Sequence, residues 1–466
     1  MELAIMVKRN YIYYLILIQT ILLYFLPSIR TNFLYIDIVF GLLSFATFMI
    51  IVVNARHIRV DAMGIWLFVF FIICSVYAYN VLIGKVSLVE YIRGLIPFSW
   101  FIYYFLYTNF MKKDELNKLL KALYYVALLS SMTVILYFVI FVSLNAYSRV
   151  TFYYVNSTVP FSILAVLFSI SKVHENKGIK RYYFFLVIGY TSVLLTETKS
   201  LLISTVIGVV FLLLSMRFDN KGEKAKFIIS ILLIIALLTF SLFSALDIGK
   251  RWNFLKYSTE NEQTNEYLVD SVKNEYDYVF MYSTENEQTN EYLDENAWNL
   301  FKGLLKQRIN PQSYEIMDKG SVSVRIMEFS IALSELKGNY MFGNGLGYEY
   351  DASELGYGSD KVGYMHNIIA YFMLDFGILG LILLISLIRL LIVQYLRNMK
   401  QNACSKELIN HNALIGAVIL SFAVYANFFA MIRSIHFNYM IIFFIAMLSL
   451  MSNNERKKVN SADSSI

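Results

Sequence analysis

Three residues in the last third of the chain have side chains suited to acid–base and anion chemistry. His366 carries an imidazole, a group that titrates near neutral pH and can accept a proton from a hydroxyl. Arg325 carries a planar fork of donors that suits phosphate or carboxylate oxygens. Glu328 follows Arg325 by one helical turn and is either a rival base or the partner of that arginine.

A glycine-rich segment stands between these residues. It reads Phe-Gly-Asn-Gly-Leu-Gly-Tyr over 342–348, and Gly343, Gly345 and Gly347 favour a tight backbone turn. Gly343 and Gly345 are also candidates for substrate contact, and so is Asn367 directly after His366. The turn and the His-Asn pair therefore mark one region, 321–381, as the most informative part of the chain.

Two further cations are candidates for binding an anion. Lys199 lies in the polar tip Thr-Glu-Thr-Lys-Ser at 196–200, between two apolar runs. Arg93 stands in another short polar segment, where it is either a binding residue or an ordinary charge near a membrane interface. Asp375 falls inside an apolar run, and ionisable groups within such runs are functional hypotheses by default.

Composition indicates what must hold these residues in place. Hydrophobic residues make up 58% of the 466 residues, charged residues only 16%, and the mean hydropathy is +0.55. A soluble domain typically carries roughly 25% charged residues, so these values predict a polytopic membrane protein. The net charge of +6 does not indicate nucleic-acid binding, because the basic residues sit in short tethers between apolar runs. Cys74 and Cys404 fit neither a disulfide nor a metal site.

The apolar runs predict an all-α integral membrane protein with about twelve transmembrane helices. The runs are 11–28, 33–54, 63–83, 96–111, 120–145, 159–171, 182–197, 200–216, 227–246, 366–388, 411–432 and 435–452. The run at 159–171 is the shortest. Four regions follow: nine helices in 1–246, one large external loop in 247–365, three helices in 366–452, and a cytoplasmic tail in 453–466.

The distribution of lysine and arginine sets the orientation. With the N-terminus in the cytoplasm, the inside segments hold 23 of these residues and the short outside segments hold 6. This positive-inside bias predicts that both termini are cytoplasmic and that 247–365 is external. The external segment holds 20 acidic and 11 basic residues, which does not contradict the topology because long loops cross regardless of charge.

The predicted external loop contains a duplication and two expected helices. The dodecapeptide at 257–268 recurs unchanged at 282–293, and a recent duplication in a tolerant loop explains it more simply than a carbohydrate-contacting role. Amphipathic patterns predict helices over 294–308 and 323–337. The second would begin after Ser321 or Ser323 and stop at Gly338.

Taken in order, these features resemble a known superfamily. An external arginine, a G-x-G-x-G turn, and a His-Asn pair opening a helix with Asp-Phe-Gly-Ile-Leu-Gly-Leu at 375–381 resemble the O-antigen polymerases and O-antigen ligases. The tip at 196–200 is similar to the superfamily's T-x-S-R-G, with Lys199 in place of arginine and Ser200 in place of glycine. The resemblance is specific over 321–381 and loose over the remaining topology.

The resemblance implies an enzyme that uses glycans linked to undecaprenyl diphosphate, in a bacterial cytoplasmic (inner) membrane. A sugar hydroxyl of one lipid-linked unit would attack the anomeric carbon of another. Arg325 and Lys199, with Arg93 third, would neutralise the diphosphate, and His366 or Glu328 would serve as the base. No metal or other cofactor is expected, because the diphosphate ester is already activated.

Alternative functions and partners remain open at this stage. The long external loop favours a polymerase of repeat units over a ligase that transfers the polymer to lipid A-core. A lipid-glycan flippase or secondary transporter is a further alternative, although no repeated set of helices supports it. Expected partners are membrane lipids, and a chain-length regulator and a flippase are possible additional ones; nucleic acid is not expected.

Overall fold

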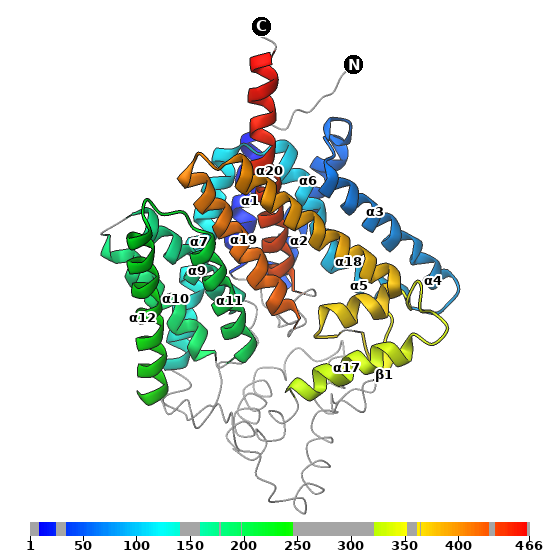
Figure 1. Cartoon of the computed structure of the whole chain (residues 1–466). Helices are drawn as coiled ribbons and strands as arrows, with labels where there is room; N and C mark the ends of the chain where they lie inside the picture. Colours follow the sequence, from blue (N-terminus) through cyan, green and yellow to red (C-terminus); the bar gives the residue numbers. More distant parts are fainter. Residues whose placement is uncertain are drawn as a thin grey trace, which may run out of the picture.

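The computed structural model of this chain consists of helices that pack side by side along most of their length (Figure 1). The described residues are 9–24, 34–139, 159–176, 179–196, 198–245, 321–351, 361–363, 365–427 and 434–463. The duplicated dodecapeptides at 257–268 and 282–293 and the expected helix at 294–308 lie outside these residues.

The elements of the first part of the chain are α1 (Arg9–Leu22), α2 (Leu34–Val53), η1 (Ala55–His57), α3 (Ala62–Val76), α4 (Ala78–Leu82), α5 (Leu88–Ser99), η2 (Trp100–Ile102), α6 (Tyr103–Phe110), α7 (Lys113–Tyr137) and α9 (Val159–Glu175). Those that follow are α10 (Lys180–Leu195), α11 (Lys199–Ser215), α12 (Lys221–Ala245), α17 (Ser321–Glu335), β1 (Tyr350–Asp351), β2 (Lys361–Val362), α18 (Ile368–Gln401), α19 (Lys406–Ala426) and α20 (Ile435–Asp463). The strands of the described chain form one two-residue antiparallel pair, β1 with β2.

The apolar runs predicted from the sequence lie mostly on helices. Five described helices are long and apolar enough to cross a membrane: Ala62–Leu82, Lys113–Tyr137, Lys221–Leu242, Ile368–Gln401 and Lys406–Ala426. The shorter apolar helices are Tyr11–Leu22, Gly41–Val53, Ser200–Ser215 and Ile435–Met451. The chain is therefore a helical membrane protein, and the count of twelve crossings stays a prediction.

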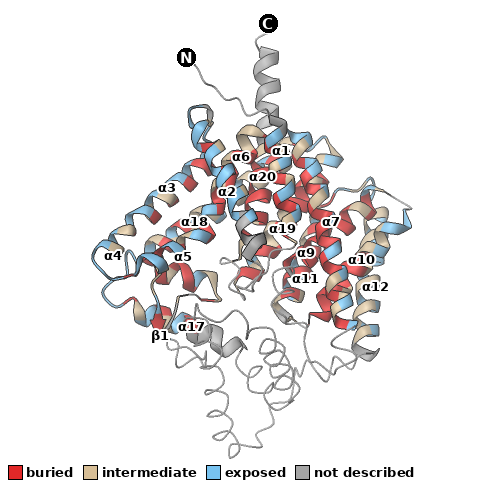
Figure 2. Ribbon diagram, turned by 180° about the vertical axis from the view of Figure 1, so that it is seen from behind, coloured by how far each residue is buried: buried red, intermediate tan, exposed pale blue. Residues whose placement is uncertain are grey.

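The shortest predicted run forms the centre of one half of the bundle. Every residue from 160 to 171 in α9 is buried, and α7, α10, α11 and α19 pack around this helix (Figure 2). A helix enclosed by other helices does not have to match the thickness of the hydrocarbon layer. Burial thus explains why a run this short still forms a stable helix.

One predicted span departs from a continuous helix. The run at 96–111 is divided between the end of α5, the short 3-10 segment η2 and α6. Pro97 lies inside α5 and has no N–H to donate, so the regular α-helical ladder is weakened there. The helix also begins earlier than expected, at Leu88, with Ser87 accepting a hydrogen bond from the amide of Glu90 as its N-cap.

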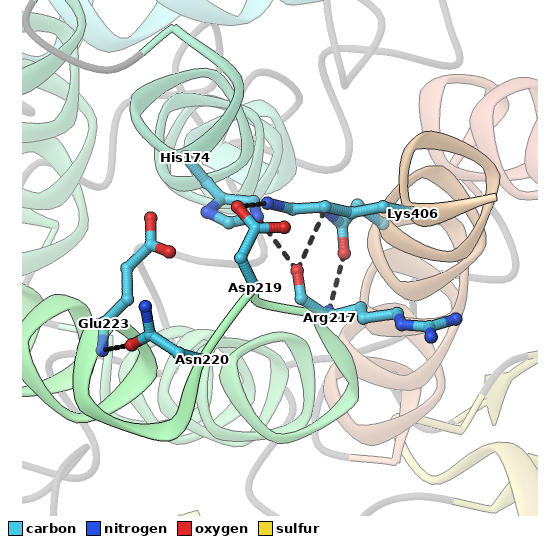
Figure 3. A network of polar contacts seen from close by, with 7 residues as sticks. His174, Arg217, Asp219, Asn220, Glu223 and Lys406 are labelled. Atoms are coloured by element: carbon cyan, nitrogen blue, oxygen red, sulfur yellow. Dashed lines mark hydrogen bonds and ion pairs between the residues drawn. The ribbon is translucent and has the colours of Figure 1, made fainter. Parts of the chain in front are cut away.

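A polar cluster, called the His174 network below, links α9 and α19 to the turn between α11 and α12, at the end of the bundle where α18 ends (Figure 3). His174 Nε2 lies 3.2 Å from the carbonyl oxygen of Arg217, whose amide donates to Asn410 Oδ1 over 2.7 Å. Lys406 and Asp219 form an ion pair of 2.6 Å. These contacts join the end of α9 and the turn between α11 and α12 to the start of α19.

Helix α17 occupies the opposite end of the molecule. It lies across that end of the bundle, near the start of α18, whereas α20 finishes at the other end (Figure 1). The sequence prediction of a helix at 323–337 is confirmed to within two residues. Gly338 has a φ of 89°, as expected for a glycine that terminates a helix.

Candidate functional site

The structure brings Glu328 and His366 into direct contact. Glu328 lies on the buried face of α17, where Ala332 and Leu336 repeat at a spacing of four residues. His366 stands two residues before Ile368, the first residue of α18, so it projects from the start of that helix. The Glu328 carboxylate oxygen Oε1 lies 2.6 Å from His366 Nδ1.

This contact uses both oxygens of the carboxylate. While Oε1 meets the imidazole, Oε2 accepts a hydrogen bond from the backbone amide of His366 over 3.2 Å. The Glu328 side chain is 0% exposed and that of His366 is 16% exposed. A buried carboxylate is strongly disfavoured unless it is hydrogen-bonded, so Glu328 fixes both the backbone and the ring of His366. An ionised carboxylate only accepts, so beside an ionised Glu328 a neutral imidazole would carry its proton on Nδ1.

The glycine turn is joined to α18 at a break in that helix. Gly377 has a φ of 62° and a ψ of −146°, which interrupts the helical ladder. The carbonyls of Leu374 and Asp375 accept hydrogen bonds from the amides of Asn344 and Gly345, each over 2.9 Å. On the far side of the break, the amides of Ile378 and Leu379 donate to the carbonyls of Tyr340 and Met341, over 2.8 and 3.1 Å.

The three glycines of the turn are explained by close packing against other elements. All have positive φ, of 69°, 91° and 80° at Gly343, Gly345 and Gly347. A Cβ at Gly343 would lie 2.5 Å from the amide of Gly377, and a Cβ at Gly347 would lie 2.4 Å from the carbonyl oxygen of Glu90. The turn is thus wedged between α18 and α5, a role that needs glycine without requiring a ligand.

Two residues that the sequence reasoning did not single out hold this turn in place. Asn80 donates from Nδ2 to the carbonyl of Asn344 over 3.0 Å, and the Tyr77 hydroxyl donates to the carbonyl of Phe342. Both come from the region around α4, inside the predicted span 63–83. The signal that could have revealed Asn80 is its polarity within an apolar run, since such residues usually have a specific partner.

The predicted cations occupy three different helices. Arg325 lies in α17, three residues before Glu328, and Lys199 is the first residue of α11; their side chains lie outside the described part of the chain. Arg93 lies within α5, not in a loop as the sequence analysis expected, and its Nη1 forms an ion pair of 2.5 Å with Glu90. Its side chain is 40% exposed, so this pair is a weak, partly solvated contact.

Asn367 has a structural role that accounts for its residue type, and Asp375 lies beside the break in the same helix. The Asn367 side-chain oxygen accepts hydrogen bonds from the amides of Ile369 and Ala370, over 2.8 and 3.1 Å, and so caps α18. The prediction that the His-Asn pair opens a helix is confirmed. Asp375 is 3% exposed and lies beside the Gly377 break, where its backbone carbonyl accepts a hydrogen bond from the amide of Gly345 in the glycine turn.

A second carboxylate of α17 is also engaged. The hydroxyl of Tyr348 donates to Glu335 Oε2 over 2.7 Å, and burial together with this carboxylate raises the pKa of Tyr348 to about 12. This contact anchors the end of α17 to the far side of the glycine turn. Among the residues that the structure describes, no three His, Cys, Asp or Glu side chains gather closely enough to hold a metal ion.

Comparison with known proteins finds one family model that matches the region of this site. Residues 184–385 match the family model described as O-antigen ligase, a region that includes α17, the glycine turn and the start of α18. No curated protein matches the chain. The resemblance to the superfamily of O-antigen polymerases and O-antigen ligases, predicted from the arginine, the glycine turn and the His-Asn pair, is thereby confirmed.

Proposed function

We propose that this protein is a polymerase of lipid-linked oligosaccharide repeat units. It would transfer a glycan from undecaprenyl diphosphate to a sugar hydroxyl of a second lipid-linked unit, on the outer face of a bacterial cytoplasmic membrane. The observation that carries this proposal is the buried Glu328 carboxylate that holds His366, within a region matching the O-antigen ligase family.

The geometry of the pair supports a role for His366 as the general base. With the proton on Nδ1 directed to Glu328, Nε2 carries the lone pair that would accept the proton of the attacking hydroxyl. The hydroxyl oxygen then forms a bond to the anomeric carbon as the bond from that carbon to the diphosphate oxygen breaks. The electron pair leaves with the lipid diphosphate, and Glu328 stabilises the imidazolium.

The negative charge of the leaving group needs a cationic partner. Arg325 stands three residues before Glu328 in the sequence of α17, which is the spacing of neighbouring positions on a helix. We assign Arg325 to the diphosphate, with Lys199 at the start of α11 as a second cation and Arg93 as a third. The binding surface would be shaped by Asn367, which caps α18, and by the glycine turn, which contains Gly343 and Gly345.

The location of the site agrees with a substrate held in the outer leaflet. The expected topology places both termini in the cytoplasm, and α17 lies at the opposite end of the bundle from the end of α20 (Figure 1). A chain-length regulator and a flippase that supplies the substrate are the partners such a polymerase would require.

Ligation is the second candidate, favoured by the description of the matching family. Ligase and polymerase differ in the acceptor, which is lipid A-core for the first and another lipid-linked repeat unit for the second. The base and the diphosphate site would be the same for both reactions, so the site geometry supports each equally.

An in vitro reaction distinguishes the two functions. Purified protein in liposomes is incubated with a lipid-diphosphate oligosaccharide, with and without lipid A-core. A ladder of products that forms without lipid A-core is the result expected for the polymerase. Transfer that occurs only when lipid A-core is added would assign the protein as a ligase, and no transfer in either mixture would contradict both assignments.

A further inference from the structure

The exposed surface of α17 is divided by chemical type. Glu328, Ala332 and Leu336 form the buried side of this helix. Next to them on the helical surface, Phe329 and Leu333 are 37% and 42% exposed. Among residues 328–337, whose side chains the structure describes, the other exposed side chains are polar: Ser330, Ser334 and Lys337. A helix with one buried, one apolar and one polar sector is suited to a boundary between lipid and water.

The apolar sector continues into the turn that follows α17. Tyr340, Met341 and Phe342 are 52%, 57% and 65% exposed. Three consecutive exposed large side chains are an unusual surface for a loop in water. Aromatic residues such as these gather where a membrane meets water.

Three backbone carbonyls of this turn are hydrogen-bonded within the protein. The carbonyl of Tyr340 accepts from Ile378 over 2.8 Å, and that of Met341 accepts from Leu379 over 3.1 Å. The carbonyl of Phe342 accepts from the Tyr77 hydroxyl. Irregular backbone at membrane depth is tolerated only where its polar groups find partners within the protein, and these three carbonyls meet that requirement.

The same contacts join the turn to exposed apolar surfaces of helices that are expected to cross the membrane. The side chain of Ile378, next to the break in α18, is 44% exposed, and Ile382 one turn further is 57% exposed. Near Tyr77, Tyr79 and Leu82 are 61% and 82% exposed. Both helices belong to segments long and apolar enough to cross a membrane, so the exposed apolar residues of the turn extend a lipid-facing surface.

We infer that α17 and the turn 339–345 are seated in the outer leaflet of the membrane, with Phe329, Leu333, Tyr340, Met341 and Phe342 among the lipids. The partner is the lipid surface itself. This refines the expectation that 247–365 is an external loop, because α17 becomes part of the membrane interface. Glu328 and His366 then lie at the level of the lipid headgroups, whichever transfer reaction they serve.

Site-directed spin labelling tests this placement. Single cysteines are introduced by Leu333→Cys and Phe342→Cys in a Cys404→Ser background, with Cys74 retained because it is fully buried. The matched controls are Ser334→Cys and Lys337→Cys on the polar sector, and Ile385→Cys provides a lipid reference, since it is 65% exposed on α18. Collisions of each label with oxygen, which enters lipid, and with a neutral nickel chelate, which stays in water, are measured in liposomes.

The inference predicts that the ratio of oxygen to nickel accessibility at positions 333 and 342 is several-fold higher than at 334 and 337, and approaches that at 385. Equal access of the nickel chelate to positions 333, 342 and 337 would overturn it, because the turn would then lie in water. Low access of both reagents at 333 and 342 would also overturn it, because another part of the protein would cover the surface. Neither result depends on which glycosyl transfer the protein performs.

Discussion

Two histidines at opposite ends of the molecule are held in different ways. His174, in the last turn of α9, meets the backbone carbonyl of Arg217 over 3.2 Å and lies against the Phe218 ring, with centroids 4.4 Å apart. His366, before the first turn of α18, meets the carboxylate of Glu328 over 2.6 Å. His174 is buried, with 4% of the residue exposed, whereas the His366 side chain is 16% exposed.

The difference separates a structural histidine from one suited to catalysis. The carbonyl and the aromatic ring that His174 meets belong to the turn between α11 and α12, so these contacts join helices. At His366, the buried Glu328 carboxylate supplies a negative charge that would stabilise an imidazolium, and partial exposure leaves the ring within reach of a substrate. By this comparison the His174 network joins helices, and the Glu328–His366 pair is the one that we propose acts in catalysis.

The largest effect is expected for the replacement of His366. His366→Ala should lower the rate of polymer formation about 10²–10⁴-fold, because it removes the proposed general base. The measurement is the initial rate of ladder formation by purified protein. His174→Ala is the matched control and should retain near wild-type activity per folded molecule while lowering the melting temperature. Equal rate losses in the two variants would contradict the assignment of His366 as catalytic and His174 as structural.

A somewhat smaller loss is expected at Arg325. Arg325→Lys keeps the charge but loses the bidentate fork. Contacts of this kind in comparable electrostatic sites lower the activation free energy by about 2–4 kcal/mol. Lys199→Arg is the paired change and should be tolerated, because the superfamily pattern has arginine at that position. Rates are compared at saturating lipid-linked donor. Full activity of Arg325→Ala would show that α17 does not bind the diphosphate.

The smallest effect on chemistry, and a clear effect on stability, is expected at the glycine turn. Gly343→Ala places a side chain at a φ of 69° against the backbone of Gly377, and the left-handed conformation alone costs about 1–2 kcal/mol. Gly41→Ala in α2 is the control, since no atom lies within 4 Å of the added Cβ. Thermal unfolding in detergent should show a lower melting temperature for the first variant only. A melting temperature unchanged by Gly343→Ala would mean that the turn is not wedged against α18.

The sequence predicted those parts of the site that depend only on residues close together in the chain. The end of α17 near Gly338, the start of α18 at Asn367 and the turn at 343–347 follow from glycine conformation and helix capping. The partner of Glu328 could not be chosen from the sequence, because Arg325 is three residues away in the chain and His366 is 38 residues away. Only the folded structure brings His366 to the carboxylate.

The breaks at Gly377 in α18 and after Pro97 in α5 were harder to predict from the sequence. The apolar run at 366–388 predicts an uninterrupted helix through Gly377. Its break depends on the turn at 340–345, which supplies hydrogen bonds to the groups that the break releases. Pro97 gave a local signal, but the extent of the disruption at η2 depends on how α5 and α6 pack against their neighbours.

The most direct test of the central claim is a double-mutant cycle between Glu328 and His366. Glu328→Gln alone should slow polymer formation about 10- to 100-fold, as expected for the loss of a charged hydrogen-bond partner. If the carboxylate acts through the imidazole, the double variant Glu328→Gln, His366→Ala should be no slower than His366→Ala. Rate losses that instead multiply in the double variant would show that the two residues act independently, and would contradict their assignment as one catalytic unit.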